Sequence, residues 1–88
     1  MRFSVNWKTA AQNDLAALWV AADTAGRRAI TTASHAIDKL LANDPDTVGE
    51  SRPRSRRIVF VAPLVAIFQV SEPDRRVDVL TVRLLPRR

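Results

Sequence analysis

The chain has 88 residues and no cysteine, so it forms one small domain with a thin core and has neither a disulfide framework nor a thiolate metal site. Its hydrophobic fraction of 47% is too high for a disordered protein. The net charge is +5, and residues 51–88 hold nine of the fourteen basic side chains but only three of the nine acidic ones. Twelve of the cations are arginine, which binds phosphate and carboxylate in a bidentate way. The cluster indicates a phosphate-bearing or acidic partner, although arginine on a merely solvated surface would give the same composition.

The first half of the chain predicts a strand and two helices. Apolar and polar residues alternate over Arg2–Trp7, which is typical of a half-buried strand. Thr9, with Gln12 three residues later, predicts a capping box for a helix from about residue 10 to 22. A second helix, capped near Asp23, continues to about residue 42. Few residues separate the two helices, so they should form an antiparallel hairpin.

The second half predicts a polar loop and three strands. The loop is Asp46–Ser55, and the strands are Arg56–Val61, Leu64–Val70 and Val77–Leu84. Pro63 separates the first two strands, because proline has no N–H for a sheet ladder. Proline and the β-branched residues also argue against a single apolar helix here. The apolar run is shorter than the roughly 20 residues that cross a bilayer.

The resulting fold class is α+β, with the order β-α-α-β-β-β and an antiparallel four-stranded sheet covered on one face by the helical hairpin. We expect five large side chains to be buried between helices and sheet: Trp19, Ile37, Leu40, Phe60 and Phe68.

Both faces of the predicted sheet are apolar. One face is expected to hold Ile58, Phe60, Leu64, Ala66, Phe68, Val70, Leu80 and Val82. The other is expected to hold Val59, Val61, Val65, Ile67, Val77 and Val79. Because one hairpin covers one face, the second face should meet a partner protein or a second copy of the chain. A partly exposed valine face on a small twisted sheet is the alternative.

Few residues are suited to chemistry. No cluster of His, Cys or carboxylate side chains has metal-ligand spacing, there is no glycine-rich phosphate loop, and we expect no metal or cofactor. His35 falls on the polar side of its helix and is predicted to be a surface residue. The remaining candidates are arginines, which can hold a phosphodiester or acidic side chains: Arg52, Arg54, Arg56, Arg57, Arg83, Arg87 and Arg88. No aromatic base-stacking platform lies near them, which argues against a sequence-specific RNA reader.

The order of these elements resembles the RelE/ParE superfamily of toxins. Three stretches carry the resemblance: ITTASHAIDKLLANDPDTVGESR, RRIVFVAPLVAIFQV and RRVDVLTVRLL. Together they cover nearly the whole chain. The resemblance implies a type II toxin that acts in the cytoplasm without a cofactor and is neutralised by a cognate antitoxin, an acidic protein that forms a hetero-oligomer with it.

Two activities follow from the resemblance. A ParE-like toxin binds and poisons DNA gyrase, whereas a RelE-like toxin cleaves mRNA on the ribosome. For a ribonuclease, Arg56 and Arg87 match basic catalytic positions, but Val65 stands at a position for a third arginine and Pro86 where a histidine often occurs. The missing general base favours gyrase binding. In either case Arg52, Arg54, Arg57, Arg83 and Arg88 are expected to contact the target or the antitoxin. A nucleic-acid-binding module without toxicity is a third interpretation.

Overall fold

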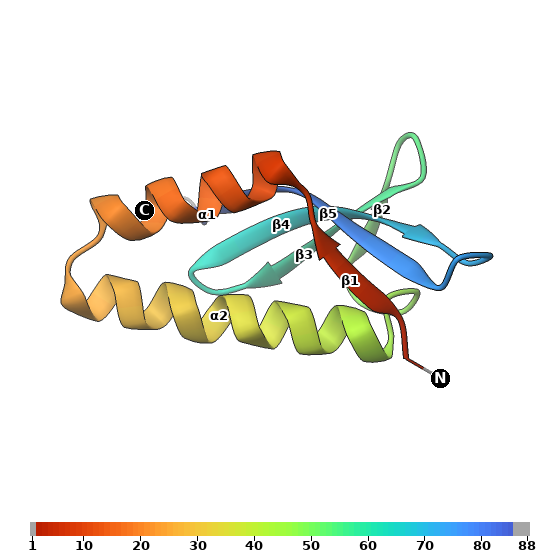
Figure 1. Cartoon of the computed structure of the whole chain (residues 1–88), viewed down its shortest axis with the longest axis horizontal. Helices are drawn as coiled ribbons and strands as arrows, with labels where there is room; N and C mark the ends of the chain where they lie inside the picture. The colour runs from red at the N-terminus through yellow and green to blue at the C-terminus, as the bar shows by residue number, and fades with distance from the viewer. Residues whose placement is uncertain (1, 86–88) are drawn as a thin grey trace.

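A computed structural model describes residues 2–85 of the chain. Within this range a short strand leads into two long helices, and four further strands follow (Figure 1). The elements are β1 (Ser4–Trp7), α1 (Thr9–Ala21), α2 (Thr24–Asn43), β2 (Glu50–Arg52), β3 (Arg56–Val61), β4 (Leu64–Ser71) and β5 (Arg76–Leu84). None of the helices in this range is long and apolar enough to cross a membrane.

The strands form one sheet in the order β1-β5-β4-β3-β2, and both helices cover the same face of it (Figure 1). Neighbouring strands are antiparallel except β1, which is parallel to β5. The predicted α+β class and the order of the six predicted elements are confirmed. The described sheet has five strands instead of four, because part of the predicted polar loop pairs with β3, and it is mixed instead of purely antiparallel, because β1 is parallel to β5.

The additional strand, β2, forms because three loop residues adopt left-handed backbone angles. Arg54 and Ser55 have φ values of 67° and 62°, which turn the chain tightly between β2 and β3. Gly49 has φ of 75°, and a Cβ at this position would collide with the carbonyl oxygen of Ile58. Glycine therefore lets the incoming chain approach β3 closely enough to pair with it.

The N-terminal cap predicted from the sequence is found for α2 but not for α1. Asp23 caps α2 as predicted, because its side chain accepts a hydrogen bond of 2.7 Å from the Gly26 N–H. The predicted capping box at Thr9 is wrong, since Thr9 is already helical and the N-cap position is Lys8. Gln12 instead donates its side-chain amide to the carbonyl oxygen of Trp7 at 2.7 Å, which ties the start of α1 to the end of β1.

The core lies between the two helices and the covered face of the sheet. Its buried members are Phe3, Ala11, Ile30, Ala33, Ile37, Leu41, Val59, Leu64, Ala66, Phe68, Val77, Val79 and Val82. Burial of Ile37 and Phe68 is confirmed. The predictions for Trp19, Leu40 and Phe60 are wrong, as these side chains are 43%, 41% and 50% exposed. Leu40 is adjacent to the buried Leu41, so it lies about 100° around α2 and points away from the sheet.

Phe60 is exposed because the turn into β4 changes which alternate residues share a face. Val61 pairs with Leu64, so odd-numbered residues of β3 share a face with even-numbered residues of β4. The predicted assignment of both Ile58 and Phe60 to the face of Phe68 is therefore wrong. A register shift at Ile67/Phe68, opposite β5, places Val77, Val79 and Val82 together on the covered face.

Helix α1 continues the edge of the sheet where β1 ends. The Lys8 N–H donates to the carbonyl oxygen of Val79 at 3.0 Å, and this is the last backbone bond from the β1 end to β5. Further along β5, the Val82 N–H donates to the Asp14 carboxylate at 3.1 Å. A side chain of α1 thus satisfies a strand donor that β1 is too short to reach.

Candidate functional site

The face of the sheet away from the helices, called the open face below, carries a polar row across all five strands. Arg52 pairs with Arg56, Arg56 with Gln69, Gln69 with Asp78, and Asp78 with Asn6. Directly paired residues of neighbouring strands point to the same face, so these side chains form a continuous row. The basic members are at the β2–β3 end of the row.

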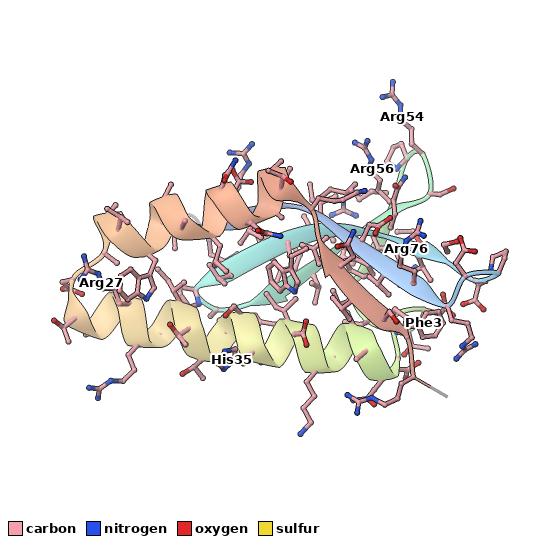
Figure 2. The ribbon with its side chains drawn as sticks, viewed as in Figure 1. Phe3, Arg27, His35, Arg54, Arg56 and Arg76 are labelled. Atoms are coloured by element: carbon pink, nitrogen blue, oxygen red, sulfur yellow. The ribbon has the colours of Figure 1, made fainter. Side chains whose placement is uncertain are left out.

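Near this end of the row, Arg54 and Arg56 project away from the sheet (Figure 2). Arg52 makes an exposed ion pair with Glu50 at 3.4 Å, which contributes little to stability in water. Arg54 lies at the tip of the β2–β3 hairpin, where its carbonyl oxygen accepts a 3.3 Å hydrogen bond from Gln69. Arg56 is exposed, and within residues 2–85 neither it nor Arg54 makes an ion pair. Their guanidinium groups are therefore available for an acidic partner.

The opposite end of the row is internally neutralised. Asp78 accepts hydrogen bonds from Arg76 Nε at 3.2 Å and Asn6 Nδ2 at 3.1 Å, and its side chain is only 14% exposed. Arg76 also lies 3.7 Å from Asp74 in the β4–β5 turn. Asp78 therefore holds Arg76 and Asn6 in place at this end of the row.

An apolar area adjoins the polar row. Phe60 pairs with Val65, and Val65 with Arg83, toward the β3–β4 turn. Ile58 pairs with Ile67 between these residues and the polar row. Phe60 is half exposed and Arg83 is exposed without an ion pair among the described residues. The open face thus combines apolar contact area with unneutralised positive charge.

A cleft of about 480 Å³ lies at the other end of the open face, between the hairpin tip at Ser55 and the β4–β5 turn. Its lining includes Gln69 and Asp78 of the polar row, and Arg76, which lies two residues before Asp78 on β5. The cleft is shallow and polar, and its one arginine is already paired with two carboxylates. It extends the contact surface of the open face.

Arg57 has a different role from its neighbours. It lies on the covered side of β3, opposite the buried Phe68. Its guanidinium donates to the carbonyl oxygens of Val48 and Gly49, both at 3.2 Å, and to Ser51 Oγ at 3.0 Å. These bonds hold the segment that leads into β2 against β3. From the covered side of the sheet, Arg57 thus stabilises the strand that carries Arg52 on the open face.

The structure brings together Arg52, Arg54 and Arg56 at one end of the open face and places Arg83 on the same face near the β3–β4 turn. Arg87 and Arg88 lie outside the described residues. The sequence interpretation missed Asn6, Gln69, Arg76 and Asp78. Of these, Gln69 could have been predicted from the sequence, because a two-residue turn after Val61 places it opposite Arg56. The others depend on the pairing of β1 and β5 and on the register shift, for which the sequence gives no local signal.

Other potentially reactive groups lie elsewhere. His35 is exposed on α2, as predicted, and borders a cleft with Trp7, Leu15 and Asp38 on the helical side of the molecule (Figure 2). Among residues 2–85 no group of His, Cys, Asp and Glu side chains is arranged to hold a metal ion. The chemistry of the open face is therefore that of guanidinium groups and apolar side chains.

Solved structures share this fold at low sequence identity. The toxin–antitoxin complex RelBE2 from Mycobacterium tuberculosis matches with a TM-score of 0.80 and 17% identity, over 97% of this chain and 93% of that one. The chromosomal ParDE toxin–antitoxin system from P. aeruginosa matches with a TM-score of 0.76 and 17% identity, over 96% and 97%. TrmO from Pseudomonas aeruginosa matches at 0.62 and 23% identity, over 93% of this chain but 35% of its own. No protein-family model and no curated protein matches the sequence.

The chain therefore has the RelE/ParE-like fold, as the sequence resemblance predicted. Part of TrmO has a similar fold, so the fold by itself does not define an activity.

Proposed function

We propose that the chain is the toxin of a type II toxin–antitoxin pair and that it inhibits growth in the cytoplasm by binding DNA gyrase through the open face. The observation that carries this proposal is the composition of that face. It joins the apolar side chains of Ile58, Phe60 and Val65 to unpaired arginines. Such a surface is suited to a protein partner, because apolar burial supplies affinity and charge supplies orientation.

A RelE-like ribonuclease is the second candidate, favoured by the exposed Arg56 beside Arg52. Two guanidinium groups can hold a phosphodiester and stabilise the charge that develops on it. The described part of the open face has no histidine or tyrosine, and its carboxylates Glu50 and Asp78 are both paired with arginine. Cleavage would therefore depend on arginine alone, including Arg87 in the tail, which makes binding the preferred mechanism.

The test compares two arginine variants of equal chemistry. Arg56 lies on the open face, whereas Arg28 is an exposed residue of α2 on the helical side. If the proposal is correct, purified chain inhibits supercoiling by purified bacterial gyrase, Arg56→Ala weakens the inhibition, and Arg28→Ala does not. Mapping of mRNA 5′ ends in induced cells distinguishes the alternative. Cuts at ribosome-bound codons that Arg56→Ala or Arg87→Ala removes would replace the gyrase assignment, and normal growth with neither effect would refute the toxin proposal.

The same face supports the proposal of an acidic antitoxin. A segment with apolar side chains flanked by carboxylates fits the open face and can fold as it binds. Its carboxylates would pair with Arg52, Arg54, Arg56 and Arg83. Arg57 is already bonded to the chain's own loop and would contribute less. Because the net charge is +5, association should be faster at low salt.

Salt dependence separates the two contributions to antitoxin binding. Between about 0.05 and 1 M salt the Debye length falls severalfold, so the electrostatic part of the affinity weakens while apolar burial persists. We expect slower association but an intact complex at high salt, measured by surface plasmon resonance with the acidic segment. Complete loss of binding at 1 M would show that the apolar half of the open face makes no contact with the antitoxin.

A further inference from the structure

A second exposed apolar surface lies on α1, on the helical side of the molecule. From Leu15 to Ala22 the sequence has no charged residue, although only one side of this helix faces the core. Trp19 is 43% exposed and Val20 is 68% exposed. At about 100° per residue, Gln12, Ala16 and these two side chains form one outward stripe centred on Ala16. An apolar stripe of this kind on a surface helix indicates a contact that the single chain does not make.

The stripe contains both a cavity and a projecting side chain. A cleft of about 350 Å³ is lined by Trp7 of β1 and by Gln12, Leu15, Ala16, Trp19 and Val20 of α1. Gln12, Leu15, Ala16 and Trp19 have the spacing i, i+3, i+4 and i+7, which is that of a hole that accepts a side chain from a facing helix. Val20 projects from the same helix one turn beyond Ala16 and is the most exposed large apolar side chain of the described residues.

The walls of this hole are held in place by polar contacts. The indole Nε1 of Trp7 donates to the Asp38 carboxylate of α2 at 3.0 Å. The Arg27 guanidinium lies 4.4 Å from the centre of the Trp19 ring and donates to the carbonyl oxygens of Trp19 and Val20 at 2.9 and 3.1 Å (Figure 2). These contacts fix the ring positions before any partner arrives, which lowers the entropic cost of binding.

The geometry points to a second copy of this chain as the occupant, and we propose a two-fold homodimer through α1. In an antiparallel pair of α1 helices that cross at Ala16, residue 12 of one copy opposes residue 20 of the other. Val20 of each copy then packs beside Gln12 at one end of its partner's hole, and the contact is made twice. A hole and a knob on the same helix are what a self-complementary, two-fold interface requires. The small Ala16 at the crossing point allows the two helices to approach closely.

Charge also favours this occupant over an acidic segment. Each copy carries a net charge of +5, so two copies associate best through a surface with few cations. The charged residues over positions 8–23 are Lys8, Asp14 and Asp23, and the antiparallel arrangement places Lys8 of one copy toward the Asp23 end of the other. The antiparallel helix dipoles are aligned favourably as well. An acidic partner is attracted instead to the arginines of the open face, which the dimer leaves free.

The test measures the oligomeric state of the purified chain and of two matched variants. Ala16→Arg places a cation at the crossing point, and Ala21→Arg makes the same change at an exposed position of α1 outside the stripe. Sedimentation over a concentration series should give twice the monomer mass for the unmodified chain and for Ala21→Arg, and the monomer mass for Ala16→Arg. Thermal unfolding of the variants controls for loss of fold.

Crosslinking provides a readout that does not depend on a loss of function. The chain has no cysteine, so a single Ala16→Cys substitution reports on its own partner. Two copies of residue 16 at a close two-fold crossing fall within the Cα separation that a disulfide allows, roughly 4.4–6.8 Å. Mild oxidation should convert Ala16→Cys to a covalent dimer and leave Ala21→Cys monomeric. A monomer at all concentrations, equal crosslinking of both variants, or a dimer that survives Ala16→Arg would each overturn the proposal. The proposal would also be overturned if Ala16→Arg left the sedimentation mass unchanged and weakened only antitoxin binding.

Discussion

Two phenylalanines on adjacent strands provide a direct test of the fold, because they differ in burial and not in chemistry. Phe68 is fully buried in the core, whereas Phe60 is 50% exposed on the open face. Phe68→Ala removes contacts on all sides and leaves a cavity, which costs about 3–5 kcal/mol. Phe60→Ala loses about half of the benefit of a buried aromatic side chain, or about 1 kcal/mol. At 0.05–0.15 kcal/mol per residue the whole chain has a stability of roughly 4–13 kcal/mol, so the first variant approaches the limit of folding.

The assay is urea unfolding followed by circular dichroism. With an m value of about 1 kcal/mol/M for a chain of this size, the midpoint should fall by about 3 M or more for Phe68→Ala and by about 1 M for Phe60→Ala. Binding to the proposed target or antitoxin should show the reverse order, since only Phe60 lies on the open face. Equal losses of stability would mean that the register between β3 and β4 is wrong.

Three further predictions concern single contacts. Asp14→Ala should lower the free energy of unfolding by about 1–3 kcal/mol because the Val82 N–H loses its charged acceptor, and Asp14→Asn, which keeps an oxygen, should recover part of the loss in urea melts. Gly49→Ala should destabilise the β2–β3 hairpin, because alanine is strained at φ of 75° and its Cβ meets a backbone carbonyl; hydrogen exchange should speed up in β2 before it does in β4. A hydrogen bond with Asp46 raises the pKa of Glu72 above its usual value. Protonated Glu72 therefore stabilises the folded state, and this contribution is lost as the pH rises through the raised pKa. Glu72→Gln should remove this pH dependence of the urea midpoint, and an unchanged pH profile would contradict the prediction.

Local sequence patterns predict much of the site because its basic end is nearly contiguous in sequence. The strand Arg56–Val61, the turn at Pro63 and the strand after it are found as expected, apart from one residue at the end of β4, and they place Arg56 on a sheet with Arg52 and Arg54 just before it. Arg57 illustrates the limit of this reasoning. It is the same residue type as Arg56 and carries the same charge, but the alternation of side chains along β3 turns it to the covered side. There its guanidinium donates to carbonyl oxygens of the loop before β2.

The sequence by itself determined the order of the elements apart from β2, the fold class and the burial of Ile37 and Phe68, because helix and strand periodicities and turn residues act over a few positions. Tertiary structure decided which faces these elements share. The register shift beside Phe68 set the faces of β5. The pairing of Val61 with Leu64, which moved Phe60 out of the core, is set by a local two-residue turn instead and could have been found from the sequence. Tertiary structure also brought Asn6 and Asp78 together across 72 positions of the chain. Such contacts depend on pairing between distant segments, and a shift of one residue reverses every side chain of a strand.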